Sequence, residues 1–291
     1  MRTGDGVREI VVQSGRAAGV VTQNGERLTA DAIVANVDHT TTLQRLLPQN
    51  HTNGRKSAPL KPSCSGFILL LGVEKTFPRL AHHNIFFSRD YRHEFQQIFG
   101  NGVMPDDPTI YVAITSKTDA GHAPEGCENW FVLVNAPPLS ERYDWQQNAC
   151  LPRQSAGEAA DYGFEARGSI RSEQMLTPHD LEQMTGAYRG ALYGASPNDR
   201  FSAFRRPHNR AKDVKGLYFA GRTTHPGGGV PMVMLSGKVA AGIVMEDFGK
   251  GSRPQLKVRA KEEHDKLSQG DSAKCFRNIF AQTVSARKVI G

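Results

Sequence analysis

Short apolar and β-branched runs, separated by turn residues, fill the first part of the chain. Two of them, at 7–12 and 17–22, flank the sequence Gln13-Ser14-Gly15 and predict a β-hairpin. A shorter run at 32–35 predicts another strand. The pattern at 38–47 then becomes helical, and a proline follows it, which favours a helix that ends there.

The middle of the chain carries longer apolar runs. Those at 67–71, 109–115 and 130–134 are nearly continuous, and this pattern is typical of strands covered on both faces. Farther on, Thr-Pro-His-Asp at 177–180 supplies an N-cap, a proline at the first helical position and an acid in the first turn. We therefore expect a helix from there through Met184.

The segment 216–237 is the most informative part of the chain. An apolar run at 217–220 predicts a strand, three consecutive glycines follow at 227–229, and Pro231 opens an apolar helical stretch that extends to 248. A strand, a glycine loop and a helix start in this order let the backbone approach a flat or anionic ligand closely. Three glycines alone fit a tight turn before a core helix equally well.

Length and composition exclude several classes of protein. A chain of 291 residues builds one large or two medium domains. No apolar run approaches the roughly 18 residues of a membrane-spanning helix, and the first residues lack the apolar core of a signal peptide. Cysteines at 64, 127, 150 and 275 and the adjacent pair His82-His83 show no metal-ligand spacing. We therefore expect no metal site and a reduced, cytoplasmic setting.

Most of the net charge of +7 belongs to the end of the chain. Residues 249–291 hold ten basic and four acidic residues, so the rest of the chain is close to neutral. This distribution argues against a nucleic-acid-binding protein, in which the folded body itself is basic. We expect a solvated, disordered tail, and contact with anionic lipid is the second interpretation.

Several blocks, taken together and in order, resemble the FAD-dependent phytoene desaturases, a family of carotenoid desaturases. Gly216-Leu-Tyr-Phe-Ala-Gly221 and the residues to 241 resemble the family's C-terminal flavin-binding segment. The blocks at 7–38 and 63–72 resemble the strand meander that returns to the flavin domain and the first strand of the substrate domain. Further family-like blocks stand at 107–111, 116–119, 123–129, 177–178, 188–194 and 206–210. The resemblance covers most of residues 7–136 and 168–248.

The resemblance implies an α/β fold of mixed α+β character. The implied fold is a partial FAD-binding, Rossmann-like flavoprotein domain with an inserted mixed-sheet substrate domain. The implied division is 1–50 for the return to the FAD-binding domain, 51–205 for the substrate-binding domain, 206–248 for the C-terminal FAD-binding segment and 249–291 for a basic tail.

FAD is the cofactor that the resemblance implies. Val7, the first residue of the meander, is the candidate beside the adenine. The other candidate cofactor-binding residues are Gly221, Arg222, Gly228, Gly229, Val230 and Met232. Arg222 replaces a residue that is usually small in the family, and either reaches a flavin phosphate or carbonyl or is a solvated loop residue.

The sequence identifies no catalytic residue. A general base is one interpretation of His225, because histidine in general is suited to proton transfer near neutral pH. We favour a loop-orienting hydrogen bond, since a carotenoid C–H is not an acid that histidine deprotonates unaided. Four aromatic residues either line an apolar substrate tunnel or pack in the core: Trp130, Phe131, Phe201 and Phe204. Arg205 and Arg206, beside Pro207, are expected to hold the domain crossing together.

Three departures from the family pattern stand out. The Rossmann-type GxGxxG loop, which cradles a pyrophosphate, is absent, because Gly4-Asp5-Gly6 is too short and precedes a strand. Residues 148–167 and the tail after 248 do not resemble the family. We therefore expect the C-terminal part of a longer protein, and we expect residues 1–291 alone to bind FAD weakly or not at all.

The family implies that the parent protein inserts double bonds into phytoene or a related linear carotenoid. FAD would take the hydride equivalent, and the substrate would come from a membrane that this cytoplasmic protein touches peripherally. The alternatives on the same scaffold are a diapocarotenoid terminal-methyl oxygenase and an amine-oxidase-like flavoenzyme. An alternative of another class is a non-catalytic remnant, or one half that pairs with a separate N-terminal polypeptide.

Overall fold

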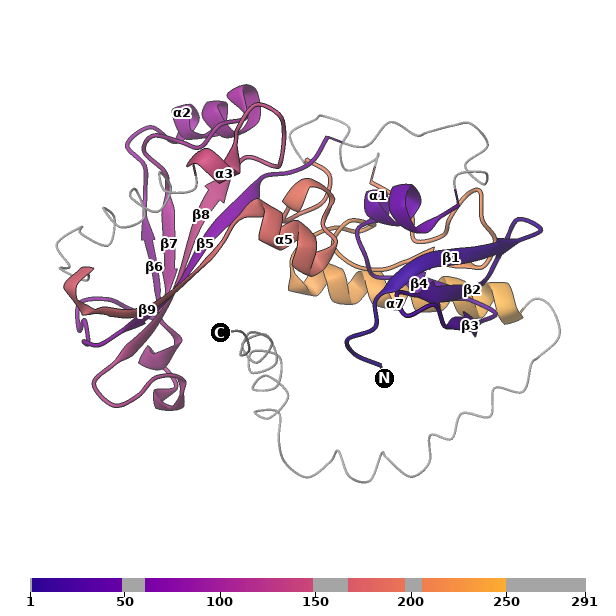
Figure 1. The fold of residues 1–291 in the computed structure, drawn as a ribbon, viewed down its shortest axis with the longest axis horizontal. Helices are drawn as coiled ribbons and strands as arrows, with labels where there is room; N and C mark the ends of the chain where they lie inside the picture. Colours follow the sequence, from indigo (N-terminus) through magenta and orange to yellow (C-terminus); the bar gives the residue numbers. More distant parts are fainter. Residues whose placement is uncertain (1, 49–60, 149–166, 197–205, 250–291) are drawn as a thin grey trace. The chain divides into compact units, whose positions relative to one another are not determined.

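The computed structural model describes residues 2–48, 61–148, 167–196 and 206–249, and three sheets lie within them (Figure 1). The contacts group Met1–Asp247 into one compact unit and Phe248–Gly291 into another. Phe201, Phe204, Arg205, nearly all of 148–167 and the basic tail lie outside the described residues. The four-part domain division stays a prediction.

The first sheet is an antiparallel meander of β1 (Val7–Gln13), β2 (Arg16–Thr22) and β3 (Arg27–Thr29). Ser14 and Gly15 join β1 to β2 with φ angles of 48° and 73°. Positive φ at both central residues gives a tight turn whose twist matches that of the flanking strands. The predicted hairpin is thus confirmed.

The second sheet pairs segments that lie far apart in the sequence. β4 (Ile33–Ala35) and β10 (Leu217–Phe219) run parallel. After β4, a helical segment is formed by α1 (His39–Thr41) and the π-helix η1 (Thr42–Leu46), as predicted for this stretch. One buried cluster joins the first two sheets: Ile10, Ala17, Ala35, Leu47, Val214, Leu217 and Phe219.

The third sheet has five strands, and every neighbouring pair is antiparallel (Figure 1). In spatial order they are β6 (His83–Phe86), β7 (Ile110–Ala113), β8 (Glu128–Ala136), β5 (Ser65–Val73) and β9 (Ile170–Leu176). The three central strands are those that the apolar runs predict. The two edge strands, β6 and β9, were not predicted.

One face of this sheet carries the larger buried cluster of the molecule. Phe67, Leu69 and Leu71 of β5 face the core together with Val132 and Val134 of β8. Trp145 of α3 (Trp145–Asn148) covers the cluster and stacks on Phe67, with ring centroids 6.4 Å apart. Between β6 and β7 the chain forms α2 (Tyr91–Phe95) and the π-helix η3 (Gln96–Asn101).

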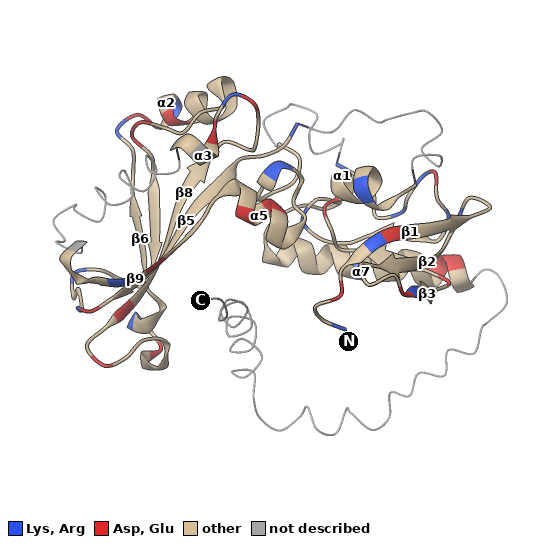
Figure 2. Ribbon diagram, viewed as in Figure 1, with Lys and Arg blue, Asp and Glu red and all other residues tan. Residues whose placement is uncertain are grey.

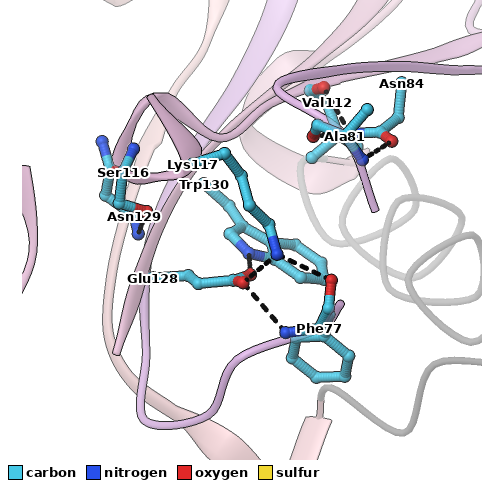
Figure 3. A network of polar contacts seen from close by, with 9 residues as sticks. All are labelled: Phe77, Ala81, Asn84, Val112, Ser116, Lys117, Glu128, Asn129 and Trp130. Carbon is cyan, nitrogen blue, oxygen red and sulfur yellow. Dashed lines mark hydrogen bonds and ion pairs between the residues drawn. The ribbon is translucent and has the colours of Figure 1, made fainter. Parts of the chain in front are cut away.

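A buried carboxylate ties the end of this sheet to two neighbouring segments (Figure 3). Glu128 is 3% exposed, and its Oε1 accepts the Phe77 backbone N–H at 2.9 Å and lies 2.6 Å from Lys117 Nζ. Its Oε2 accepts the indole N–H of Trp130 at 2.8 Å. Lys117 ends η4 (Thr115–Lys117), ahead of η5 (Ala120–His122). A charge buried here is tolerated because both oxygens have partners.

The return from this sheet passes through short helices. η6 (Arg167–Ser169) precedes β9, and α5 (Pro178–Thr185) and η7 (Tyr188–Gly190) follow it. At the start of α5, Thr177 and Asp180 form a reciprocal capping box, and the helix ends at Gly186 with φ 65°. The structure thus confirms the predicted start of this helix and its extent.

The last described helix, α7 (Val230–Gly249), has little of its surface covered. It is 20 residues long, and its buried residues are Ser236 and Ala240. Lys238 is the single charged residue between 230 and 245 in the sequence, and Figure 2 shows acidic residues at the C-terminal end of the helix. Among the described helices, none combines the length and the apolar character needed to cross a bilayer.

Candidate functional site

The candidate site begins where the two parallel strands end. β4 and β10 point the same way, so the residues after Ala35 and after Phe219 emerge at the same edge. Gly221 has φ 120°, and a Cβ built on it would lie 2.9 Å from Asn36 Oδ1. Glycine is required there for two reasons, the positive φ and the close contact with the residue after β4.

A buried asparagine supports the loop that follows β10. Asn209 is 3% exposed, and its Nδ2 donates to the carbonyl oxygens of Phe219 and His225 and to Ser236 Oγ, each at 3.0 Å. Ser236 Oγ accepts the Gly221 N–H at 3.1 Å. One side chain therefore joins the end of β10, the glycine loop and α7. The sequence reasoning assigned Asn209 no such role.

Two guanidinium groups and one carboxylate lie at this loop. Arg206 Nη1 donates to the Arg222 carbonyl at 2.9 Å, and Arg222 Nη2 lies 3.4 Å from Thr185 Oγ1. Burial lowers the pKa of Arg222, and the charge of Asp38 opposes that shift. Burial raises the pKa of Asp38. The hydrogen bonds that its carboxylate accepts from backbone N–H groups and the charge of Arg222 oppose this rise. The loop thus holds ionisable groups in a partly desolvated setting.

His39 is held neutral beside this cluster. Its backbone N–H donates to Thr223 Oγ1 at 3.0 Å, and its ring lies 4.5 Å from the Phe219 ring. Burial lowers its pKa to about 4. A cavity of about 10 Å³ lies among Asp38, His39 and Thr223, which is room for about one water molecule. This cavity is too small for an organic substrate.

Six of the seven predicted cofactor residues lie on one continuous segment. Gly229 has φ 95°, and a Cβ built there would meet no atom within 4 Å. Val230 is 75% exposed and Met232 is 42% exposed at the start of α7. Val7 stands apart from them in the chain, at the start of β1, with its side chain 40% exposed. Their predicted role in binding a cofactor stays a prediction.

His225 takes part in the loop through its backbone. Its N–H donates to the Pro207 carbonyl at 2.8 Å, and its own carbonyl accepts from Asn209. Its side chain lies at an exposed position. These bonds orient the loop, which is the role that we favoured for His225, although the backbone rather than the imidazole makes them.

Tyr193 lies beside the glycine loop and was not among the predicted site residues. A Cβ built on Gly228 would lie 3.3 Å from Tyr193 Cδ1, and the side chain of Tyr193 is 48% exposed. The Tyr193 N–H donates to Ser63 Oγ at 3.0 Å. Next to it, Gly194 approaches Thr223 so closely that a Cβ would lie 2.9 Å from the threonine side chain. The segment around Tyr193 is therefore fitted against the loop.

The open face of the five-stranded sheet leads to the same segment. The strand register places Ile85, Tyr111, Leu133, Ile68 and Leu176 in one row across all five strands. The next row holds Phe131 and Leu70 at its centre. Leu192, beside Tyr193, packs over Gly66 on this face, where a Cβ would lie 3.2 Å from it. An apolar face thus adjoins the neighbour of Tyr193.

The two neighbouring aromatic candidates on β8 have different surroundings. Trp130 is 3% exposed, lies in the buried cluster and packs against Phe77 with ring centroids 5.2 Å apart. Phe131 points to the opposite, open face, since side chains alternate along a strand. Of the two interpretations given for these residues, core packing therefore holds for Trp130, and Phe131 is left as the candidate substrate contact.

A larger cavity of about 360 Å³ is lined by other residues. Its walls include Ile98, Phe99, Pro138, Arg142 and Arg189. None of the predicted cofactor residues lines it. In the described part of the chain, no group of three His, Cys, Asp or Glu side chains could hold a metal ion.

Similarity to known proteins agrees with the sequence blocks. The chain is 37% identical over 240 residues to the 1-hydroxycarotenoid 3,4-desaturase of Flavobacterium sp. (strain P99-3), covering 82% of this chain and 49% of that protein. It is 36% identical over 251 residues to the 4,4'-diapolycopene oxygenase of Methylomonas sp, covering 83% and 49%. The chain belongs to the phytoene desaturase family. The ζ-carotene-forming phytoene desaturase of Myxococcus xanthus is 35% identical over 236 residues, covering 80% and 46%.

This member of the family spans about half the length of the curated relatives that it matches. No family model matches the chain. Among solved structures, an oxidoreductase from Methanosarcina mazei superposes with a TM-score of 0.48 at 17% identity, over 84% of this chain and 49% of that one.

Proposed function

We propose that this chain supplies the glycine loop and the substrate face of an FAD-dependent oxidoreductase that desaturates phytoene or a related linear carotenoid. The observation that carries the proposal is the loop from Gly221 to Gly229, held by Asn209 at the ends of two parallel strands. The similarity to carotenoid desaturases supports a linear carotenoid as the compound that is oxidised at this loop. Because the chain spans half of those relatives, the activity belongs to the complete assembly.

The residues of the loop fit a flavin. Gly229 leaves open space where any other residue would place a Cβ, so a flat ring system can approach the backbone. The first-turn N–H groups of α7 lack helical carbonyl partners and stabilise negative charge near them. FAD, when bound, accepts the hydride equivalent from the substrate. Val7, Gly221, Arg222, Gly228, Val230 and Met232 are proposed to contact it, with Arg222 as the cation for a phosphate or carbonyl group.

The open sheet face is proposed to hold the polyene. Five strands spaced about 4.8 Å apart give a face roughly 19 Å wide between the outer strands, suited to an extended hydrocarbon. Phe131 lies in the central part of that face, and Tyr193, whose neighbour Leu192 packs on the same face at Gly66, lies beside Gly228 of the glycine loop. We propose that these two side chains position the carbon–carbon bond to be oxidised. The five-stranded sheet would then be the core of the predicted substrate domain.

His39, beside the loop, is poorly suited to act as a general base. His39 is neutral with a pKa of about 4, and its ring packs against Phe219. The contributions that we assign to the protein are therefore orientation, exclusion of water and electrostatics, with the electron transfer left to the flavin.

We also propose peripheral membrane contact by a cytoplasmic protein, since a linear carotenoid resides in a bilayer. The exposed side chains of Phe87 (69%) and Tyr91 (54%), near the edge strand β6, suit an interface between water and lipid. Binding to vesicles of phosphatidylcholine and phosphatidylglycerol, lost on Phe87→Ser with Tyr91→Ser, is the expected result.

Product analysis tests the reaction. The chain is co-expressed with the complementary half of a relative in bacteria that accumulate phytoene. The pigments are then separated, and their molecular masses are measured by mass spectrometry. Added conjugation without added oxygen supports desaturation. Phe131→Glu should abolish turnover, because it places a charge on the apolar face proposed to hold the substrate. The fold should stay intact, because Phe131 lies outside the buried cluster of the sheet. The exposed Glu125→Gln serves as the control.

One alternative reaction has a specific observation behind it. The 36% identity to a 4,4'-diapolycopene oxygenase matches that of the desaturases, so oxidation of terminal methyl groups is the second candidate. An oxygenated product in the same assay would replace the first proposal by this one. Release of peroxide from amines would indicate an amine-oxidase-like enzyme. No turnover by a flavin-loaded assembly would indicate a non-catalytic remnant.

A further inference from the structure

The larger cavity, which none of the predicted cofactor residues lines, is formed by four segments that are distant in the sequence. They are the residues before β5, the π-helix η3, the residues after β8 and the short helix η7. The cavity holds about 360 Å³, which lies within the range of small-molecule sites and equals the liquid volume of roughly a dozen water molecules. A ligand of about ten non-hydrogen atoms therefore fits it.

The walls of this cavity combine apolar and basic side chains. The apolar ones are Pro62, Ile98, Phe99 and Pro138, and the basic ones are Lys61, Arg142 and Arg189. Among the described residues that line the cavity none is acidic, and within the described part of the chain none of the three basic side chains forms an ion pair. A neutral hydrocarbon gains nothing from three cations. The walls therefore fit an anion that carries an apolar group.

Arg189 adopts a backbone conformation that is uncommon for its residue type. Its φ of 54° and ψ of 30° lie in the left-handed region. Its N–H donates to Glu182 Oε1 at 3.3 Å, and its carbonyl accepts the Leu139 N–H at 3.0 Å. The second bond fastens η7 to the segment that carries Pro138 and Arg142. Conformations of this kind cluster at ligand-binding sites, where the surrounding structure holds them in place.

The other two basic residues are also held at the cavity. Arg142 Nη1 donates to the Gly100 carbonyl at 3.2 Å, and a Cβ built on Gly102 would lie 3.4 Å from Arg142 Cδ. A guanidinium has five N–H donors, so this bond leaves others for a ligand. The Lys61 carbonyl accepts the Ser196 N–H at 2.8 Å. All three basic residues are therefore tied to neighbouring segments where these meet at the cavity.

We propose that this cavity is a second ligand site, which binds a phosphate monoester with a short alkyl group. The phosphate would lie against Lys61, Arg142 and Arg189, and the alkyl group against Ile98 and Phe99. A phosphate monoester carries a charge of about −2 near neutral pH and offers three acceptor oxygens, which suits three cations better than a singly charged carboxylate. Guanidinium groups bind phosphate through paired N–H donors. Two sources supply this chemistry, a soluble alkyl phosphate and the headgroup of phosphatidic acid in a bilayer.

Isothermal titration calorimetry of the whole 291-residue chain with hexyl phosphate tests the proposal. Inorganic phosphate and hexanol are titrated separately, because each carries one half of the proposed chemistry. Hexyl phosphate should bind at one site, with an affinity at least about tenfold higher than that of inorganic phosphate or of hexanol, since the cations and the apolar wall both contribute. Added sodium chloride should weaken this binding, because salt screens the attraction between the phosphate and the three cations.

Substitutions locate the site. Arg189→Asn should weaken the binding of hexyl phosphate at least about tenfold, and asparagine keeps the backbone because it tolerates the left-handed region. Arg142→Gln should weaken it by a similar factor, while Arg189→Lys, which keeps the charge, should lose less affinity than Arg189→Asn. Arg92→Gln is the matched control, since it removes the same charge from an exposed position on α2, and it should change the affinity by less than about twofold. Circular dichroism establishes that each variant folds.

Phosphatidylcholine vesicles with and without phosphatidic acid distinguish the two sources. Binding that requires phosphatidic acid, and that hexyl phosphate displaces, supports the site and identifies a lipid headgroup as its ligand. Binding of hexyl phosphate without binding to the vesicles supports the site and identifies a soluble ester. The inference is overturned if hexyl phosphate binds no more tightly than inorganic phosphate or hexanol, or if Arg189→Asn and Arg92→Gln bind it equally well. None of these readouts needs a flavin or a carotenoid, so the result is independent of the proposed function.

Discussion

The five-stranded sheet can be compared with the part of the molecule that carries the proposed flavin loop, namely β1–β4, β10, residues 221–229 and α7, which we call the flavin-loop region. Both are built from strands and helices, but within the described residues only the sheet covers its own core. The sheet closes its own core, with Trp145 as a cover and Glu128 satisfied by three partners. The flavin-loop region has a small core, a two-stranded parallel sheet and a helix with its outer side exposed. The comparison indicates that stability resides in the first region and that the second depends on what binds to it.

The largest expected effect comes from comparing alanine substitutions at two adjacent residues, Trp130 and Phe131, which lie on opposite faces of β8. Trp130→Ala is expected to destabilise the chain by about 3–5 kcal/mol, because it opens a cavity in the larger core. Phe131→Ala is expected to cost about 1 kcal/mol, since that ring lies on the open face. Urea unfolding followed by circular dichroism measures both. Equal losses would mean that the two faces of the sheet are covered alike.

The second prediction concerns the buried carboxylate of Glu128 at the end of the sheet. Glu128→Gln should destabilise the chain by about 2–4 kcal/mol, because Lys117 and the Phe77 N–H lose a charged acceptor in a buried place. Glu125→Gln, three residues earlier and exposed, should change the free energy of unfolding by less than about 0.5 kcal/mol. If both variants unfold at the wild-type urea concentration, the network contributes nothing.

A smaller effect belongs to the flavin-loop region and depends on pH. The folded pKa of His39 is about 4, against an ordinary 6.5, so between these values the unfolded chain binds the proton and the folded chain does not. Stability is therefore lost as the pH falls from about 6.5 toward 4, by about 2.5 kcal/mol at pH 4.5. Asp38 acts in the opposite direction, since burial raises its pKa and its protonation favours the folded state.

His39→Gln should remove that loss, and urea unfolding at pH 7 and pH 4.5 measures it. The exposed His208→Gln should keep the wild-type dependence. A wild-type slope in His39→Gln would assign the acid sensitivity to other groups.

Local chemistry explains what the sequence predicted well. The Ser14-Gly15 turn and the capping box of Thr177 and Asp180 depend on residues within three positions, and both were predicted. The strands β6 and β9 were missed, because edge strands carry polar residues and lack a continuous apolar run; β9 reads Ile-Arg-Ser-Glu-Gln-Met-Leu. Their place in the sheet is set by pairing with strands distant in sequence.

The candidate site shows the same limit. The glycine loop was predicted from consecutive glycines, which is a local pattern. Asn209 and Tyr193 were passed over, since their roles arise from contacts with Ser236, 27 residues away, and with Gly228, far along the chain. An uncharged asparagine in a connecting segment carries no local signal of burial, and the structure alone reveals that Asn209 holds the loop.

The exposed side of α7 has a consequence for the protein in a cell. Methionine, valine and leucine side chains displayed in this way are what chaperones and quality-control proteases bind on unassembled subunits. A copy made in excess of its binding partner would then be removed rather than stored. The amount of this polypeptide would follow the supply of whatever covers the helix, even with transcription held constant.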